Sequence, residues 1–259
     1  MEGVSGIVSY DQAYHSGAEY TDGKKWFMSD LNAMINGLRA GGADEIHVYD
    51  EHFYGRNIDI SLLDDKDVFL YLGKPRYTEE WAGGLDESFS GLLLLGFHSK
   101  RGTYDALLNH SYEPDIKDIR INGISVGEIG VEAAIAGGLG VKLVMLTADS
   151  EGCREARELL GDVRAVSVKE SCSETGAVCY PLKHTYDAIY EAAKKTAEEG
   201  ADSRLFDCGD DVTFEFTFFD TPYASLYREK FGEPVIKGKS PLECWAEYWK
   251  NKLEVQKAL

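Results

Sequence analysis

Three of the six histidines in this chain come directly after apolar, strand-like runs. They are His52, His98 and His110, which follow residues 46–51, 92–97 and 107–109. Ligands of open α/β sheets bind outside the carboxyl ends of the strands, so side chains that different strands deliver there can converge although the sequence separates them. Imidazoles serve both in metal binding and in proton transfer. We therefore expect these three histidines to share one site of either kind.

Glu128 follows another predicted strand end, and two explanations account for it. The segment Ser125-Val126-Gly127-Glu128 fits the S-x-x-E capping box at the start of a helix, in which the glutamate is structural. The same position also places a carboxylate at the sheet edge that receives the histidines. Imidazoles and carboxylates at one edge form a zinc-type ligand set. Asp50 and Glu51, next to His52, are able to orient its imidazole.

Ser125 offers an alternative chemistry. Residues 123–127 match G-x-S-x-G and lie between a predicted strand and a predicted helix, which is the context of a serine nucleophile elbow. A catalytic triad also needs a downstream histidine, and the only candidate, His184, begins a predicted helix. No HGGG-type oxyanion segment precedes the motif. A serine hydrolase that uses Ser125 remains an alternative to the metal site.

The elements that must position these residues alternate along the chain. Predicted helices cover residues 24–40, 128–136, 151–160, 184–198 and 241–253. Predicted strands cover residues 45–50, 67–72, 90–97, 116–122, 141–147, 163–169, 212–219 and 235–238. Nearly continuous apolar strands between helices are typical of a parallel sheet covered on both faces. We predict an α/β fold with a mostly parallel sheet covered by helices, carrying the metal site in residues 1–160, and a smaller α+β domain in residues 161–259.

Composition narrows the possible partners. The 259 residues include 27 basic and 45 acidic side chains, a formal charge of −18, which opposes binding to nucleic acid or to an anionic membrane surface. No apolar run approaches the roughly 18 residues of a membrane-spanning helix, and the first residues lack the pattern of a signal peptide. The five cysteines form no C-x-x-C pair, which suits a reducing compartment. We expect a cytoplasmic protein without nucleic-acid or membrane partners.

Several short segments resemble a known family. Met1 to Gly6 is similar to the second half of the Ser-x-Asp-x-Glu-Gly signature of the zinc D-aminopeptidase family associated with dipeptide-transport operons. Later blocks of that family resemble, in the same order, residues 50–52, 96–98, 109–111 and 122–130. The similarity extends over essentially the whole chain, through Gly238-Lys239 and the last helix.

The resemblance implies a function and a set of site residues. It implies a dinuclear site in which Glu2, His52, His98 and Glu128 hold two zinc ions, with His110 nearby as a catalytic residue. It implies a metal-dependent aminopeptidase that removes an N-terminal, D-configured residue from short peptides, in a homo-oligomer such as a ring. Ligands of this kind also accept other divalent metals. The resemblance does not identify substrate-binding residues.

The chain departs from the family pattern in two places. An aspartate ligand belongs two residues before the Glu-Gly pair, and the sequence begins at Met1, one residue before Glu2. We expect a start set too late; the alternative is a catalytically impaired, ring-forming structural or binding homologue. The second departure is Ser173-Glu174-Thr175, where the family pattern has a basic residue. If that residue binds the peptide carboxylate, Glu174 alters the specificity.

Overall fold

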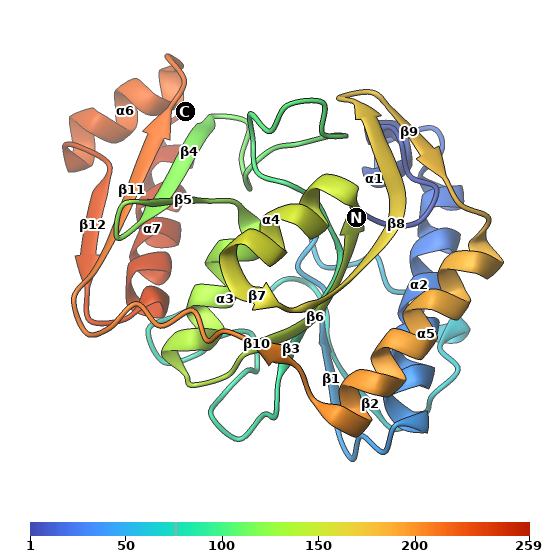
Figure 1. Cartoon of the computed structure of the whole chain (residues 1–259). Helices are drawn as coiled ribbons and strands as arrows, with labels where there is room; N and C mark the ends of the chain where they lie inside the picture. The colour runs from blue at the N-terminus through green and yellow to red at the C-terminus, as the bar shows by residue number, and fades with distance from the viewer. Residues whose placement is uncertain (76) are drawn as a thin grey trace.

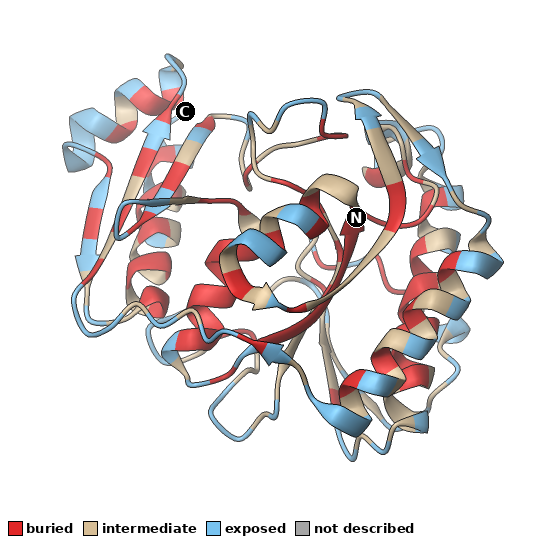
Figure 2. Cartoon of the chain, in the orientation of Figure 1, coloured by how far each residue is buried: buried red, intermediate tan, exposed pale blue. Residues whose placement is uncertain are grey.

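The computed structural model describes residues 1–75 and 77–259 and has a mixed α/β fold (Figure 1). Its first four-stranded sheet has the order β3 (Leu92–Phe97), β6 (Leu143–Asp149), β8 (Arg164–Ser173), β9 (Gly176–Cys179). The first three strands are parallel, and β9 returns antiparallel to β8. Every residue of β6 is buried, which is typical of a central strand in a parallel sheet (Figure 2).

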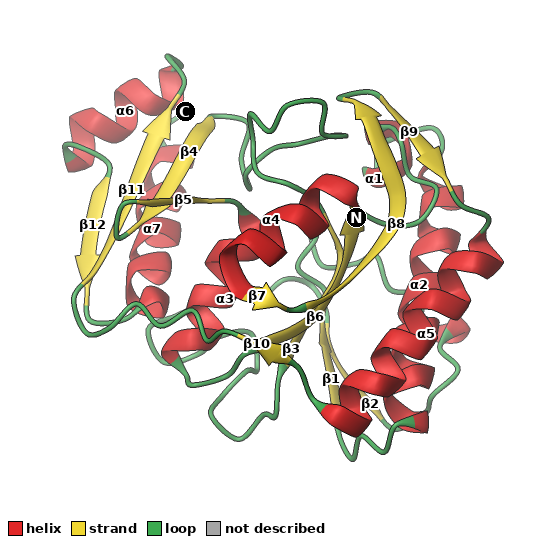
Figure 3. Ribbon diagram, in the orientation of Figure 1, coloured by secondary structure: helices red, strands yellow, loops and turns green. Residues whose placement is uncertain are grey.

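Helices cover both faces of this sheet. On one face, α3 (Glu128–Gly138) and α4 (Ser150–Leu160) pack against Leu146 and Ala148 of β6. On the other face, α2 (Tyr20–Ala40) and α5 (Leu182–Glu199) pack against Met145. The two helices α2 and α5 lie side by side at one side of the molecule (Figure 3). The alternation of side chains along β6 therefore supplies two separate cores.

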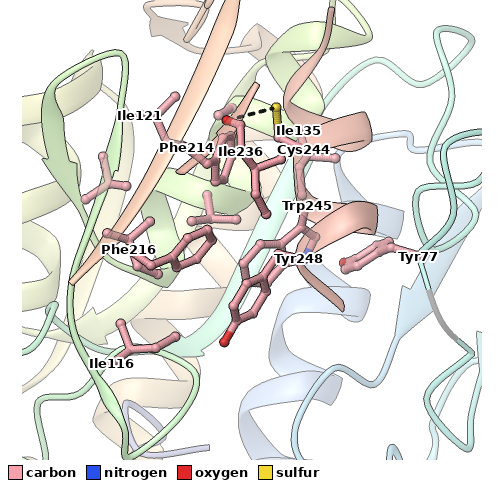
Figure 4. Close-up of a cluster of buried hydrophobic side chains, with 14 of the residues drawn as sticks. Tyr77, Ile116, Ile121, Ile135, Phe214, Phe216, Ile236, Cys244, Trp245 and Tyr248 are labelled. Carbon is pink, nitrogen blue, oxygen red and sulfur yellow. Dashed lines mark hydrogen bonds between the residues drawn. The ribbon is translucent and has the colours of Figure 1, made fainter. Parts of the chain in front are cut away.

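The second four-stranded sheet is wholly antiparallel and lies at the other side of the molecule (Figure 3). Its order is β12 (Val235–Gly238), β11 (Val212–Phe218), β4 (Ile116–Ile121), β5 (Ile124–Val126). The helices that accompany it are α6 (Pro222–Phe231) and α7 (Pro241–Gln256). Phe216 of β11 stacks on Tyr248 of α7 with ring centroids 4.2 Å apart, beside the buried Trp245 (Figure 4). This aromatic core fixes α7 against the sheet.

The remaining elements are short. The strands β1 (Ile46–Tyr49) and β2 (Val68–Tyr71) form a parallel pair, and β7 (Gly161–Asp162) pairs with β10 (Asp202–Ser203). A helical turn, α1 (Tyr10–Ala13), and a 3-10 turn, η1 (Ile60–Leu62), complete the described elements. Within the described residues, no helix combines the length and the apolar character needed to cross a membrane.

The predicted fold class is confirmed, with some differences in the elements. The helix α6 and the strands β5 and β9 were not predicted, because each is short and only partly apolar. The run 107–109, expected to be strand-like, is a loop whose Leu107 and Leu108 are buried against the N-terminal segment. Both four-stranded sheets contain strands from before and after residue 160. A division into domains 1–160 and 161–259 remains a prediction.

Candidate metal centre

Five residues from separate segments meet at the end of the parallel sheet. Glu2 lies in the N-terminal loop, His52 three residues after β1, and His98 directly after β3. His110 lies in the loop between β3 and β4, and Glu128 is the first residue of α3. The expectation that they share one sheet edge was wrong, because β1 and β5 belong to other sheets than β3. The loops, and not a single sheet, bring these side chains together.

The distances define one cluster. Ligand atoms of Glu2, His98 and His110 all lie within 4.8 Å of one another. His52 Nε2 is 3.2 Å from Glu2 Oε1. Glu128 Oε1 is 3.6 Å from Nε2 of both His98 and His110, whose rings stack with centroids 4.1 Å apart. The residues singled out in the sequence as ligands or as catalytic are therefore neighbours.

Hydrogen bonds on the far side of two imidazoles fix which ring nitrogen faces the cluster. His98 Nδ1 lies 3.0 Å from the carbonyl of Ser99, and His110 Nδ1 lies 2.9 Å from the carbonyl of Leu108. A carbonyl only accepts hydrogen bonds, so Nδ1 carries the hydrogen and Nε2 of the neutral ring presents a lone pair. Two Nε2 lone pairs and a Glu128 oxygen then face one another. Such a group of acceptors suits a shared cation, and a carbonyl behind each imidazole is the usual support of a metal ligand.

The electrostatics favour the protonation states that bind metal. Burial lowers the pKa of His98, and burial also lowers the pKa of His52. Burial alone would raise the pKa of Glu128, but His98, His110 and the Tyr112 N–H hold it below its usual range. Neutral imidazoles and ionised carboxylates are the forms that coordinate zinc. The donor set therefore fits a zinc ion in both chemistry and charge.

Glu2 is buried beside His52, whose Nε2 lies 3.2 Å from Glu2 Oε1. Burial would raise the pKa of Glu2, but the neighbouring His52 lowers that pKa. Glu2 is 3% exposed, so its carboxylate is ionised in a nearly dry environment. A buried anion of this kind has a strong requirement for cations.

The loop that carries Glu2 is held by backbone contacts and by a buried lysine. The Gly3 N–H donates to the Gly96 carbonyl at 3.0 Å, and a Cβ at Gly3 would lie 1.5 Å from the Phe97 carbonyl oxygen, so only glycine fits. Lys169 Nζ, on β8, donates to the carbonyls of Glu2 at 2.5 Å, Val4 at 2.9 Å and Ile7 at 2.5 Å. Lys169 is fully buried. These contacts place Glu2 directly beside the end of β3.

A half-buried residue, Glu155, ties the His98 segment to the Glu128 segment. Glu155 of α4 accepts hydrogen bonds from the N–H of Lys100 at 2.7 Å and of Gly127 at 3.2 Å. These groups lie two residues after His98 and one residue before Glu128. Tyr112 adds a third contact, because its N–H donates to Glu128 Oε1 at 2.7 Å. Neither Lys169 nor Glu155 was predicted from the sequence as a site residue.

Ser125 has neither of the roles considered for it. The N-cap of α3 is Gly127 and has no side-chain cap, so the predicted capping box is wrong. Ser125 Oγ instead donates to Asp118 at 2.6 Å and accepts from Lys100 Nζ at 2.9 Å. Within the described residues no histidine hydrogen-bonds to Ser125. Its hydroxyl is held by Asp118 and Lys100, without the histidine that a Ser-His-Asp triad requires.

Comparison with known proteins assigns the family. Residues 1–231 match the model of the Peptidase M55 family, described as D-aminopeptidase. The chain belongs to the M55 family. This M55 chain is 31% identical to the D-aminopeptidase of Bacillus subtilis (strain 168) over 181 residues, which are 69% of the chain and 64% of that relative. The alignment thus spans slightly less than two thirds of the relative's length.

A solved structure has the same fold as this M55 chain. It is the Zn-dependent D-aminopeptidase DppA from Bacillus subtilis, a self-compartmentalizing protease, and it superposes with a TM-score of 0.89 at 23% sequence identity. The superposition covers 99% of the present chain and 94% of the other. This likeness extends the shared architecture to the whole chain.

Proposed function

We propose that this M55 chain is a zinc-dependent aminopeptidase that removes a D-configured N-terminal residue from short peptides. The main observation in support is the group of imidazole and carboxylate acceptors that face one another at 3.2–3.6 Å. Membership of a D-aminopeptidase family supports the reaction and its stereochemistry. The zinc dependence stated for the structural relative supports the choice of metal.

Glu2, His52, His98 and Glu128 are the proposed ligands of two zinc ions per subunit. Together with His110 the cluster offers five donors, one more than a single tetrahedral zinc uses. Glu2 lies between His52 and the pair His98 and His110, so its carboxylate would help to hold the metal. Zinc would supply Lewis-acid polarisation of the scissile carbonyl and acidification of the attacking water. Manganese, cobalt or iron would also suit these ligands.

His110 is the proposed proton-transfer residue. Its Nδ1–H is held by the Leu108 carbonyl, so Nε2 faces the cluster as a proton acceptor. From that position Nε2 can take the proton of the attacking water and return it to the leaving amine. The stacked ring of His98 holds the imidazole in this orientation. His110 thus lies among the proposed metal ligands, but its proposed role is proton transfer and not metal binding.

We further propose a cytoplasmic homo-oligomer that encloses its active sites and takes short peptides as substrates. The description of the structural relative as self-compartmentalizing supports this assembly. The strongly negative charge of the chain supports the absence of nucleic-acid partners. Sedimentation velocity would measure the assembly; a monomer at micromolar concentration would contradict it.

The proposed activity is tested by hydrolysis of a dipeptide of two D-alanines, with the L,L-dipeptide as the stereochemical control. We expect zinc-dependent release of free alanine from the D,D-dipeptide, loss of activity with a chelator, and recovery after zinc is restored. Ser125→Ala should retain the activity, because Asp118 and Lys100 hold the hydroxyl and no histidine among the described residues hydrogen-bonds to it. Absence of hydrolysis with zinc bound would favour an impaired binding homologue, and loss of activity in Ser125→Ala would favour a serine hydrolase.

A further inference from the structure

Arg101 lies beside the cluster and carries a charge that the fold leaves unpaired. Within the described part of the chain its guanidinium forms no ion pair, and its side chain donates no hydrogen bond. Its Nε is buried without a partner. The chain has 45 acidic residues, so an arginine without a carboxylate partner in such a setting is unexpected. The guanidinium has unused, directed donors.

The position of Arg101 connects it to the candidate metal centre. It follows His98 by three residues, a span of at most about 11 Å along an extended chain. Its backbone N–H donates to Oγ of Ser111, the residue after His110, at 3.3 Å. Arg101 is one of the residues that line the large crevice containing Glu2, His98 and Glu128. Arg101 also borders a smaller adjoining hollow, together with Tyr10 and Glu174.

The orientation of Arg101 is set by a ring and not by an anion. Its guanidinium carbon lies 5.3 Å from the centroid of Phe219, the residue after β11. Stacking on an aromatic ring holds the planar guanidinium while leaving its N–H edge available. A guanidinium edge binds a carboxylate through two parallel hydrogen bonds. The site is therefore preorganised for an anion with the geometry of a carboxylate.

We propose that Arg101 binds the C-terminal carboxylate of a dipeptide substrate. This inference rests on the proposed aminopeptidase function and specifies its substrate class. In a dipeptide the carboxylate lies one residue, roughly 3.5 Å, beyond the scissile carbonyl, so its partner must be close to the metal ligands. A longer peptide would present an uncharged amide at the same place. Arg101 thus selects dipeptides over longer peptides and over C-terminal amides.

The test compares two ligands that differ only in this charge. They are the dipeptide of two D-alanines and its C-terminal amide, and their binding is measured by calorimetry on metal-free protein, which does not turn them over. We expect the wild type to bind the free acid about 10- to 100-fold more tightly than the amide, the range of a charge-assisted hydrogen-bonded pair. Arg101→Gln should bind both ligands equally, and Arg101→Lys should keep part of the preference.

Arg56 provides a matched control. It lines the same crevice and stacks on Tyr54 at the same 5.3 Å, yet it follows β1 and not β3. Arg56→Gln removes one positive charge and should keep the preference for the acid. Thermal unfolding of each variant separates loss of binding from loss of fold.

The outcomes distinguish this inference from the proposed function. Equal binding of acid and amide by the wild type, or an acid preference that survives in Arg101→Gln, would overturn the role of Arg101. An Arg101-dependent preference in a protein that hydrolyses neither ligand with zinc would establish the anchor and refute the aminopeptidase. With activity present, Arg101→Gln should lower kcat/KM for the acid by the same 10- to 100-fold and leave kcat/KM for the amide unchanged.

Discussion

Lys169→Met removes the ammonium that holds the Glu2 loop while nearly keeping the volume of the side chain. Lys169 Nζ donates to the carbonyls of Glu2, Val4 and Ile7, all of which are buried residues. The Val4 carbonyl still accepts from the Ile7 N–H, so the variant leaves the carbonyls of Glu2 and Ile7 without a donor. Each such carbonyl costs about 1–3 kcal/mol, or about 2–6 kcal/mol for the two. Burial lowers the pKa of Lys169 to about 8, so removing the charge relieves about 3 kcal/mol of desolvation. The net loss in the free energy of unfolding is then about 1 kcal/mol, within a range of about −1 to 3.

The same variant should weaken zinc binding, because Glu2 loses the contact that fixes its backbone. We expect the zinc affinity to fall about 10- to 100-fold, the usual effect of losing a residue that orients a metal ligand. Urea denaturation measures the stability, and competition with a chromophoric chelator measures the affinity. Lys117→Met, on the exposed face of β4, is the control and should change neither quantity. A Lys169→Met protein with wild-type zinc affinity would refute the positioning role, whatever its stability.

Three further predictions follow from other buried contacts. The two carboxylate oxygens of Glu155 accept from the N–H groups of Lys100 and Gly127, and Glu155→Gln keeps only one of these oxygens. We expect the zinc affinity, measured by chelator competition, to fall about 10-fold. An unchanged affinity would show that His98 and Glu128 are positioned independently of Glu155. Burial raises the pKa of Asp30 to about 6, although the hydrogen bonds that Asp30 accepts from Ser5 act to lower it. The folded chain therefore binds a proton on the Asp30 carboxylate more tightly than the unfolded chain does. Its stabilisation is full below about pH 4 and is lost as the pH rises to about 6, so Asp30→Asn should gain about 3 kcal/mol relative to wild type between pH 4 and 7 in urea denaturation. A pH-independent difference would contradict this. His110→Ala should keep its zinc by elemental analysis while kcat falls about 10²- to 10⁴-fold; loss of zinc would make His110 a ligand instead.

The sequence predicted which residues gather but not how they do so. His52 and His98 follow strands as expected, because β3 is an apolar run that ends directly before His98 and β1 (Ile46–Tyr49) ends three residues before His52. His110 was assigned to a strand end because Leu107 and Leu108 are apolar, and they are buried in a loop instead. Apolar character predicts burial more directly than it predicts hydrogen-bonded strands.

The positioning residues escaped prediction because their partners are distant in the sequence. Lys169 is the last residue of a predicted strand, where a charged side chain gives no sign that it is buried. Its partners, the carbonyls of residues 2, 4 and 7, are backbone groups that no motif encodes. Ser125 illustrates the reverse case: its motif is complete, but Asp118 and Lys100 bind the hydroxyl. Arg101 was missed for the same reason, since its isolation from carboxylates is visible only in three dimensions.

Zinc content per subunit tests the proposed metal centre most directly. The protein would be purified without chelator, supplied with zinc and dialysed, and its bound zinc would be measured by elemental analysis. His98→Ala, which removes the most buried imidazole of the cluster, would be measured in the same way. We predict about two zinc ions per subunit in the wild type and a clear loss in His98→Ala. A wild type that retains no zinc, or a His98→Ala protein that retains the full amount, would contradict the assignment of this cluster as the metal site.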